Sequence, residues 1–321
     1  MEISTFSDFE AYAAAIQDAD TRVMLSRLDR DVWQISRFMV NGISVQQGLE
    51  GSGSIVTGAT RPDGWAIFIP KTNAFSLTAN GRHLDECSLT ILGPGAEFCI
   101  TASTANEWCS IFIPFDLTSA WASDLGSHPI PLGSHVAQVM RTSQDRLTRL
   151  RAVVQRLSAA VDHHSGLLAL PAPVAGAASE LKEVIVQALD AGGSASSLVP
   201  GRPSISRELI LGRVKDYLHD YTDSPMSVED LATAARVSER TLRTVFHDYF
   251  GVGPRRYLLL RQLHLVRRTL QASDPAIATV STAASRFGVW EFGRFAHRYQ
   301  ILFGELPSAT LKRERRVGAC R

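Results

Sequence analysis

The sequence predicts an α+β protein of several domains: a β-rich N-terminal domain with a helical pair, followed by an all-α C-terminal domain. Three observations indicate this. Short apolar runs separated by turn residues fill the first third of the chain, and helical spacing replaces them after Pro131. Residues 191–204, rich in Gly, Ser, Ala and Pro, then precede a wholly helical remainder. At 321 residues the chain is too long for one ordinary core.

The β-rich domain is predicted over residues 1–133 and opens on an amphipathic stretch. In it Phe6, Phe9, Tyr12 and Ile16 follow the spacing of one helical face. Eight or nine strands should follow, because several runs alternate in polarity and turn residues separate many of them. The runs lie at residues 21–28, 33–40, 43–50, 54–60, 64–70, 74–79, 88–95, 97–103 and 107–114. Such a series is typical of a β-sandwich or small barrel.

A helical segment is predicted over residues 134–190, either packed on the β-rich domain or used in dimerisation. Its first helix carries an apolar stripe with arginines opposite. The stripe consists of Val136, Val139, Leu147, Leu150, Val154, Leu157 and Val161. A second helix is expected from about Ala177 to Leu189. Residues 191–204 have little to bury, which indicates an interdomain linker.

The net charge of +1 conceals a division of the chain. Residues 201–321 hold 20 Lys and Arg and 12 Asp and Glu, a net charge of +8. Of the 33 basic and 32 acidic residues in the chain, this leaves 13 Lys and Arg and 20 Asp and Glu for residues 1–200, a net charge of −7. A basic half of that size indicates a polyanionic partner such as nucleic acid. The alternative is a chance excess of charge on a solvated helical surface.

Composition argues against a membrane, secreted or metal-binding protein. Hydrophobic residues make up 45% of the chain and charged residues 20%, and no apolar run approaches the roughly 20 residues of a membrane helix. The N-terminus lacks the early cations of a signal peptide, so a cytoplasmic protein is expected. The four cysteines form no C-x-x-C pair and are interpreted as structural. No cofactor and no metal are predicted.

Two segments of the helical remainder repeat each other. Leu242, Phe246, Phe250, Gly251, Pro254 and Leu258 recur 53 residues later as Phe295, Tyr299, Phe303, Gly304, Pro307 and Leu311. In each copy a helix should end at the Gly and a new helix should begin at the Pro. The helices are predicted at residues 204–221, 228–235, 239–250, 254–272, 279–287, 291–303 and 307–313.

Each copy contains a short helix, a tight turn and a longer helix, the pattern of a helix-turn-helix unit. The longer helix of such a unit enters the DNA major groove, so its outward side chains are the candidates for base contacts. In the first unit these are Glu239, Arg240, Arg243, Thr244 and His247, and in the second they are Glu291, Arg294, His297 and Arg298. The inward stripe of the second unit is expected to be Phe292, Phe295, Tyr299 and Leu302.

The 19 residues from Pro254 to Ala272 predict a helix about 28 Å long, at ~1.5 Å per residue. Adjacent major-groove faces lie ~34–36 Å apart, so this helix can hold two recognition helices near successive grooves. Surface arginines would suit phosphate contacts, which position a protein without carrying sequence information. The phosphate candidates are Arg255, Arg256, Arg261, Arg286, Lys312 and Arg313, with Arg267 and Arg268 also expected on the surface of the long helix.

These residues resemble the AraC/XylS family of bacterial transcription regulators over about residues 205–313. The segments "VSERTLR…F…FGVGPRRYL" and "GRFA…Y…LFGELPSATL" look most like the branch that contains the ethanolamine-operon regulator. The N-terminal segments "FSDFEAYAAAI" and "EWCSIFIP" are similar to the β-rich sensor domain of that branch. The resemblance implies a cupin-like effector-sensing domain, a DNA-binding domain with two helix-turn-helix units at residues 205–313 and, often, dimerisation. Residues 314–321 would be a basic tail.

The second unit departs from the family pattern at two positions. Val289 follows Gly288 where many members have Phe, and Gly293 replaces a polar residue early in the second recognition helix. Two roles for this unit stay open: base recognition, or mainly phosphate contact.

The sequence therefore predicts a sequence-specific DNA-binding transcription regulator, an effector-responsive activator of a neighbouring operon. Its expected partners are promoter or operator DNA, RNA polymerase, a small-molecule effector and a second copy of the chain. Aromatic residues of the β-rich domain are candidates for an effector pocket, although each also suits an ordinary sandwich core. They are Trp65, Phe68, Phe75, Phe98, Trp108 and Phe112.

Two alternatives compete with this prediction. A cupin-type enzyme would bind metal through several His ligands, but His83 is the only histidine in residues 1–127. The sequence also lacks a G-x-S-x-G, a P-loop and an H-E-x-x-H motif, so no enzyme is predicted. A protein-interaction scaffold with a basic helical module is the second alternative, against which the paired recognition helices argue.

Overall fold

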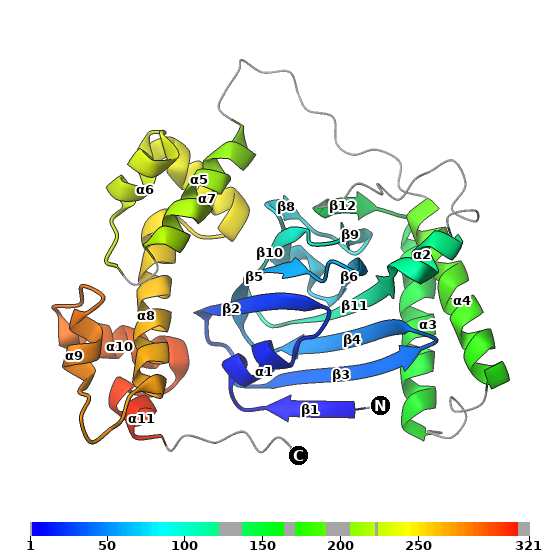
Figure 1. The fold of residues 1–321 in the computed structure, drawn as a ribbon, viewed down its shortest axis with the longest axis horizontal. Helices are drawn as coiled ribbons and strands as arrows, with labels where there is room; N and C mark the ends of the chain where they lie inside the picture. Colours follow the sequence, from blue (N-terminus) through cyan, green and yellow to red (C-terminus); the bar gives the residue numbers. More distant parts are fainter. Residues whose placement is uncertain (1, 122–136, 164–170, 191–205, 222–223, 314–321) are drawn as a thin grey trace. The chain divides into compact units, whose positions relative to one another are not determined.

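The computed structural model describes residues 2–121, 137–163, 171–190, 206–221 and 224–313. Contacts divide the chain into two units (Figure 1). Unit 1 comprises Met1–Val23 and Asp29–Val199, and unit 2 comprises Met24–Leu28 and Pro200–Arg321. The predicted linker at residues 191–204 and basic tail at residues 314–321 lie outside the described residues. The expected class is confirmed: a sheet-rich N-terminal part precedes a helical C-terminal part.

The described residues of unit 1 contain two β-sheets. The larger sheet has seven strands in the order β1 (Glu2–Phe6), β3 (Trp33–Val40), β4 (Ile43–Glu50), β11 (Asn106–Pro114), β6 (Gly64–Thr72), β9 (Ser88–Leu92) and β12 (Ala137–Arg141). The smaller has five, in the order β2 (Ala19–Arg27), β5 (Gly53–Thr60), β10 (Glu97–Ala102), β7 (Leu77–Ala79) and β8 (Arg82–His83). The second half of β2, from Met24 on, is counted with unit 2. All nine predicted strands are present, and β1, β8 and β12 add to them. The amphipathic start forms β1 and the short helix α1 (Phe9–Ala15).

A helical layer covers one face of the seven-stranded sheet. Helices α3 (Gln144–His163) and α4 (Pro171–Asp190) lie side by side in Figure 1. Side chains alternate along each strand, so every second residue of the central strands faces this layer. One buried cluster combines Trp65, Ile67 and Ile69 of β6, Ile111 and Ile113 of β11, and Leu147, Leu150 and Leu181 of the helices. The intervening strand residues face the five-stranded sheet.

Residues 137–141 differ from the prediction, which places Val139 on a helix. They form strand β12, whose Val139 pairs with Thr90 of β9 in an antiparallel register. The reason is tertiary, since β9 offers the unpaired backbone of a sheet edge, and a strand beside it satisfies those groups. The helix that carries the predicted apolar stripe, α3, begins only at Gln144. Val136 lies outside the described residues.

Unit 2 contains the seven predicted helices. They are α5 (Arg207–Asp220), α6 (Val228–Ala235), α7 (Glu239–Phe250), α8 (Pro254–Ala272), α9 (Val280–Ser285), α10 (Phe292–Phe303) and α11 (Pro307–Lys312). The bounds of α6, α7 and α8 coincide with the prediction, and those of the others differ by at most three residues. Local signals suffice here, because caps, Pro and Gly mark most helix ends.

The sequence repeat is also a repeat in structure. Gly251 ends α7 with φ 69° and Gly304 ends α10 with φ 73°, left-handed values that favour glycine. The backbone N–H of each glycine donates to the carbonyl of the residue four positions earlier: Gly251 to His247, and Gly304 to Gln300. Pro254 and Pro307 then occupy the first turns of α8 and α11. The same local chemistry therefore ends and restarts the helices in both copies.

Candidate functional site

The first helix-turn-helix unit consists of α6 and α7. A capping box starts α6: Asp230 N–H donates to Ser227 Oγ at 3.1 Å, and Ser227 N–H donates to Asp230 Oδ2 at 2.8 Å. The Ser227 backbone N–H lowers the pKa of Asp230. Ser238 then caps α7 by accepting from Thr241 N–H at 3.2 Å. These caps define the turn that sets α7 against α6.

The outer face of α7 contains every base-contact candidate of this unit. Its inner face is anchored by buried side chains, of which Leu242 and Phe246 are 0% exposed. The exposed residues of the helix include Glu239, Arg240, Arg243, Thr244 and His247. Thr244 Oγ1 donates to the Arg240 carbonyl at 3.2 Å, so this hydroxyl keeps acceptor capacity for a partner outside the helix. Arginine and histidine on one exposed face are suited to base edges and phosphates.

The two N-caps of the second unit are one residue further apart than those of the first. The N-cap of α9, Thr279, lies 52 residues after Ser227, whereas the N-cap of α10, Glu291, lies 53 residues after Ser238. The turn begins alike in both units, since Val237 N–H donates to Ala232 O at 3.1 Å and Val289 N–H to Ala284 O at 3.2 Å. Trp290 is the additional residue, and it is 77% exposed.

Helix α10 also carries its candidates on the exposed side. Glu291, Arg294, His297 and Arg298 are all exposed. Arg294 NH1 lies 3.0 Å from Glu291 Oε2, so this pair is partly engaged within the helix. The expectation for Phe292 is wrong: it is 40% exposed, because the inner face of α10 begins at Phe295. A Cβ at Gly293 would meet no atom within 4 Å, which leaves this part of α10 open.

Several phosphate candidates of unit 2 lie together with a predicted base-contact residue. Arg255, Arg256, Arg261 and Arg298 line one groove of about 580 Å³, which α8 forms with residues 224–226, residues 287–288 and one residue of α10. Burial lowers the pKa of Arg256, and the nearby charge of Arg298 lowers it further. Arginines grouped closely enough to affect one another in this way form a cationic surface that suits a phosphate backbone.

The phosphate candidates differ in how far neighbouring residues of the chain already engage their side chains. Arg261 NH2 donates to the Tyr221 carbonyl at 3.0 Å, so it holds the end of α5. Arg256 NH2 donates to Ser26 O at 3.0 Å, within unit 2. Arg286 lies over the ring of Phe287, and Arg313 pairs with Glu305 at 3.0 Å. Arg255 and Lys312 are exposed.

Arg267 does not lie on the surface as expected. Its side chain is 4% exposed and pairs with Glu305 at 2.6 Å. The helical phase of α8 places it among Leu263, Val266 and Leu270, so the acidic partner is needed to compensate the buried charge. Arg268, the next residue, is exposed.

A cavity in unit 1 lies between the two sheets. About 60 Å³ of it is available to the centre of a water molecule. Phe68, Phe98 and Trp108 line it. The other three effector-pocket candidates lie elsewhere. Trp65 faces the helical layer, Phe75 is 73% exposed, and Phe112 lies beneath the guanidinium of Arg61 at 4.9 Å.

One end of the cavity contains a buried carboxyl group. Glu50 Oε1 accepts from Tyr12 Oη at 3.1 Å and from Trp108 Nε1 at 3.2 Å, and Glu50 Oε2 accepts from Ser54 Oγ at 2.7 Å. Burial raises the pKa of Glu50, although these hydrogen bonds oppose the shift. Burial and the nearby Glu50 hold the pKa of Tyr12 well above its usual value.

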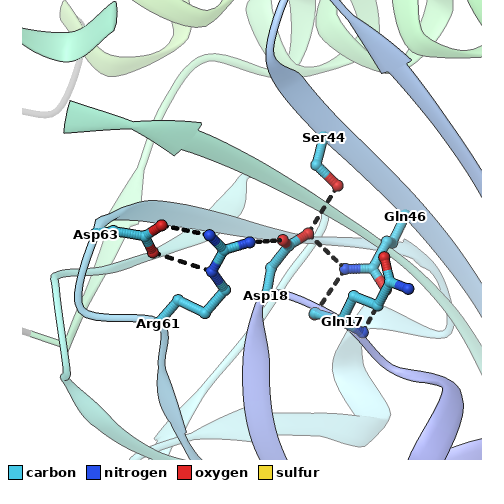
Figure 2. Close-up of polar contacts among 6 residues, drawn as sticks. All are labelled: Gln17, Asp18, Ser44, Gln46, Arg61 and Asp63. Atoms are coloured by element: carbon cyan, nitrogen blue, oxygen red, sulfur yellow. Dashed lines mark hydrogen bonds and ion pairs between the residues drawn. The ribbon is translucent and has the colours of Figure 1, made fainter. Parts of the chain in front are cut away.

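The α1–β2 segment lines the cavity and is held by a polar network (Figure 2). Gln46 accepts from Gln17 N–H at 2.8 Å and donates to Gln17 O at 2.7 Å and Asp18 Oδ2 at 2.8 Å. Asp18 Oδ2 also accepts from Ser44 Oγ at 2.7 Å, and Asp18 Oδ1 lies 3.3 Å from Arg61 NH1. Arg61 also pairs with Asp63, which raises the pKa of Arg61 and lowers that of Asp63.

The polar cavity residues are absent from the sequence-based candidates. Asp18, Gln46, Glu50 and Asn106 all line the cavity, but nothing in their residue types distinguishes them from surface residues. One signal was available: Gln46 and Glu50 lie four residues apart on β4, so they share a face. Which face is buried depends on the second sheet, and the sequence pattern does not contain that information.

Neither a membrane-crossing helix nor a metal-binding group stands out among the described residues. None of their helices is both long and apolar enough to cross a membrane. Nor do they contain a group of three or more His, Cys, Asp and Glu side chains placed to hold a metal ion.

Comparison with known proteins identifies relatives of the helical unit and of much of the chain. A family model described as a helix-turn-helix domain matches residues 231–313. XylDLEGF operon transcriptional activator 1 of Pseudomonas putida is 26% identical over 227 residues, 71% of this chain and 65% of that protein. XylDLEGF operon transcriptional activator 2 of the same organism is 32% identical over 127 residues, 40% of this chain and 77% of that protein. The chain thus matches slightly less than two thirds of the first relative.

A solved structure adds a distant likeness. The AraC-like transcriptional activator CuxR is 14% identical, and the match covers 88% of this chain and 100% of that chain with a TM-score of 0.41. The family assignment rests on the sequence relatives. The residues that the helix-turn-helix model matches, 231–313, lie in unit 2. The chain belongs to the AraC/XylS family of transcription regulators.

Proposed function

We propose that the protein is a sequence-specific DNA-binding transcription regulator that activates a neighbouring operon in response to a small molecule. One observation carries this proposal: α7 and α10 each present an exposed polar face on a buried aromatic anchor, and α8 joins them. Each face combines arginine with acidic and histidine side chains, which are the groups that distinguish base edges in the major groove. Two such faces on one chain suit two adjacent half-sites.

Contacts with the DNA backbone would come from the groove that Arg255, Arg256 and Arg298 line. Arg298 then belongs with the phosphate contacts, and Arg294 and His297 remain as the base contacts of the second unit. The net charge of +8 on residues 201–321 supports electrostatic attraction to DNA, which is independent of sequence. Specificity would come chiefly from α7, because part of the α10 face is engaged in the Glu291–Arg294 pair.

Activation and effector binding rest on separate support. The names of the relatives describe activators of an operon, and we infer the same sign of regulation here. The cavity of unit 1 supports a small-molecule effector. RNA polymerase as a partner, a homodimer through α3 and α4, and residence in the cytoplasm belong to the same proposal. Membership of the branch that contains the ethanolamine-operon regulator, which the sequence motifs support, also belongs to this proposal.

We infer further that the protein is not an enzyme. Among the described residues that line the cavity, none is His, Cys, Lys or Arg. Its two carboxylates already accept hydrogen bonds from neighbouring side chains, so neither is placed to take a proton from a substrate.

Footprinting of the full chain on DNA upstream of its own gene tests the proposal. We expect two protected segments about 10 base pairs apart, with affinity about a thousandfold above that for random duplex. Equal affinity for random duplex at every salt concentration would contradict specific recognition. Transcription in vitro with RNA polymerase then tests activation separately.

A further inference from the structure

The cavity of unit 1 has apolar walls. Most of the lining surface is apolar, and the residues that contribute to it include Val56, Phe68, Leu77, Leu92, Phe98 and Ile100. Its accessible space corresponds to about four water molecules, at roughly 15 Å³ each on this measure. The volume that about four water molecules occupy is close to the volume of one substituted six-membered ring. Apolar walls around a space of this size favour a small organic molecule over ordered water.

Two buried polar atoms of the lining lack an ordinary hydrogen bond. Asn106 Nδ2 and Thr60 Oγ1 are buried and have no partner within hydrogen-bonding geometry. The Asn106 amide lies close enough to Glu50 to lower the pKa of that carboxyl, but it forms no well-aligned hydrogen bond. Both residues line the cavity and are less than 5% exposed. Buried polar groups rarely stay unpaired, so a ligand that hydrogen-bonds to them would stabilise the site.

The charges around the cavity oppose an anion. Glu50 and Asp18 line it, whereas Arg61 is held outside the lining by Asp18 and Asp63. A carboxylate placed here would meet two acidic side chains and no cationic partner in the described lining. A cation would gain little either. Glu50 accepts from Tyr12, Ser54 and Trp108, and Asp18 from Ser44, Gln46 and Arg61, so few acceptor positions remain.

We propose that the cavity of unit 1 binds an uncharged, ring-sized apolar molecule with a hydrogen-bond acceptor, and that it excludes carboxylates. Asn106 Nδ2 donates to that acceptor. Only the identification of this ligand as the effector rests on the proposed function. The binding itself is a property of unit 1.

A series of matched compounds tests the charge preference on the full chain without DNA. Benzamide, benzoate and benzylamine share a ring and differ in charge. Calorimetric titration should show benzamide binding about tenfold or more tightly than either charged compound. Benzoate or benzylamine binding as tightly as benzamide would overturn the proposal. So would the failure of benzamide, benzyl alcohol and acetophenone to bind at millimolar concentration.

Substitution of Glu50 identifies the source of the discrimination. Glu50→Gln keeps the shape and removes the charge, so it should reduce the benzamide-to-benzoate preference several-fold. Glu97→Gln, on an exposed residue of the same unit, should leave the preference unchanged. An unchanged preference in Glu50→Gln contradicts the electrostatic argument, and the wild-type series decides the question if that variant does not fold. Footprinting on the same preparations separates a failure of ligand selectivity from a failure of DNA binding.

Discussion

Arg267 and Glu305 form a buried ion pair in unit 2. Arg267 NH1 lies 2.6 Å from Glu305 Oε1, and the two side chains are 4% and 17% exposed. Glu305 also accepts from Thr310 Oγ1 at 2.9 Å and pairs with Arg313 at 3.0 Å. The guanidinium of Arg267 lies 4.8 Å from the ring centroid of Phe303. One carboxylate thus connects α8 to α11 through the turn that follows α10.

Removal of this carboxylate should destabilise unit 2 strongly. Glu305→Ala leaves the buried Arg267 charge without its partner, and we expect a loss of about 3–5 kcal/mol in the free energy of unfolding. Glu291→Ala is the matched control, because it breaks a Glu–Arg pair whose side chains are 70% and 73% exposed. That variant should lose no more than about 1 kcal/mol. Urea titration measures both, and equal losses contradict the structural role of Glu305.

The division between base and phosphate contacts predicts different effects on DNA binding. Arg240→Ala, on the outer face of α7, should reduce the preference for the specific site by about 1–3 kcal/mol. Arg255→Ala should weaken binding to all sequences about equally, since phosphate contacts carry no sequence information. Gel-shift titrations on the operator and on random duplex distinguish the two. Identical behaviour of the variants would show that the assigned roles are wrong.

Replacement of a glycine by alanine in unit 2 should change the stability in opposite directions, depending on whether the glycine ends a helix or lies inside one. Gly251→Ala and Gly304→Ala place a Cβ at φ 69° and 73°, so each should destabilise unit 2 by about 1 kcal/mol or more. Gly293→Ala lies inside α10 with no atom within 4 Å of the added Cβ, so it should stabilise by about 0.5–1 kcal/mol. Thermal unfolding measures all three. A stabilising Gly251→Ala would contradict the left-handed cap.

Because His264 is buried, unit 2 should become less stable as the pH falls. Burial lowers its pKa to about 3 from the usual 6.5, and its Nε2 lies 3.1 Å from Leu25 O within unit 2. Because the folded pKa is the lower one, the unfolded chain binds the extra proton between pH 6.5 and 3. The stability is therefore fully present above pH 6.5 and declines as the pH falls, by at most about 1.4 kcal/mol per unit.

A His264→Gln variant checks this dependence, because Gln cannot titrate in that range. Denaturant titrations at pH 7 and pH 5 should show a smaller drop for the variant than for the wild type. An equal drop in both proteins assigns the pH dependence to other groups.

Much of unit 2 could be predicted from the sequence. Ser227, Ser238, Gly251 and Pro254 act on the backbone within a few residues, so the bounds of α6, α7 and α8 follow from local chemistry. The exposed faces of α7 and α10 follow from helical phase. Phe292 is an exception, because the extra residue Trp290 lies just before α10 and the buried stripe starts one turn later.

For unit 1 the sequence predicts the positions of the strands, but it does not predict which side chains line the cavity. Alternation shows that Trp65 and Phe68 face opposite sides of β6, yet not which side faces the helices. Phe98 and Phe75 look alike in sequence, but one lines the cavity and the other is exposed. The choice depends on the packing of the second sheet and of α3 and α4, which lie far away along the chain.

The sequence by itself determined the helix-turn-helix repeat, the strand positions and the family, because caps, turns and periodicity act over a few residues. Tertiary structure alone decided that residues 137–141 form an edge strand, that Arg267 is buried against Glu305, and that Glu50 lies in an apolar cavity. The physical reason is the same in each case. Burial, edge pairing and charge compensation depend on groups brought together from distant parts of the chain, and a local pattern does not specify them.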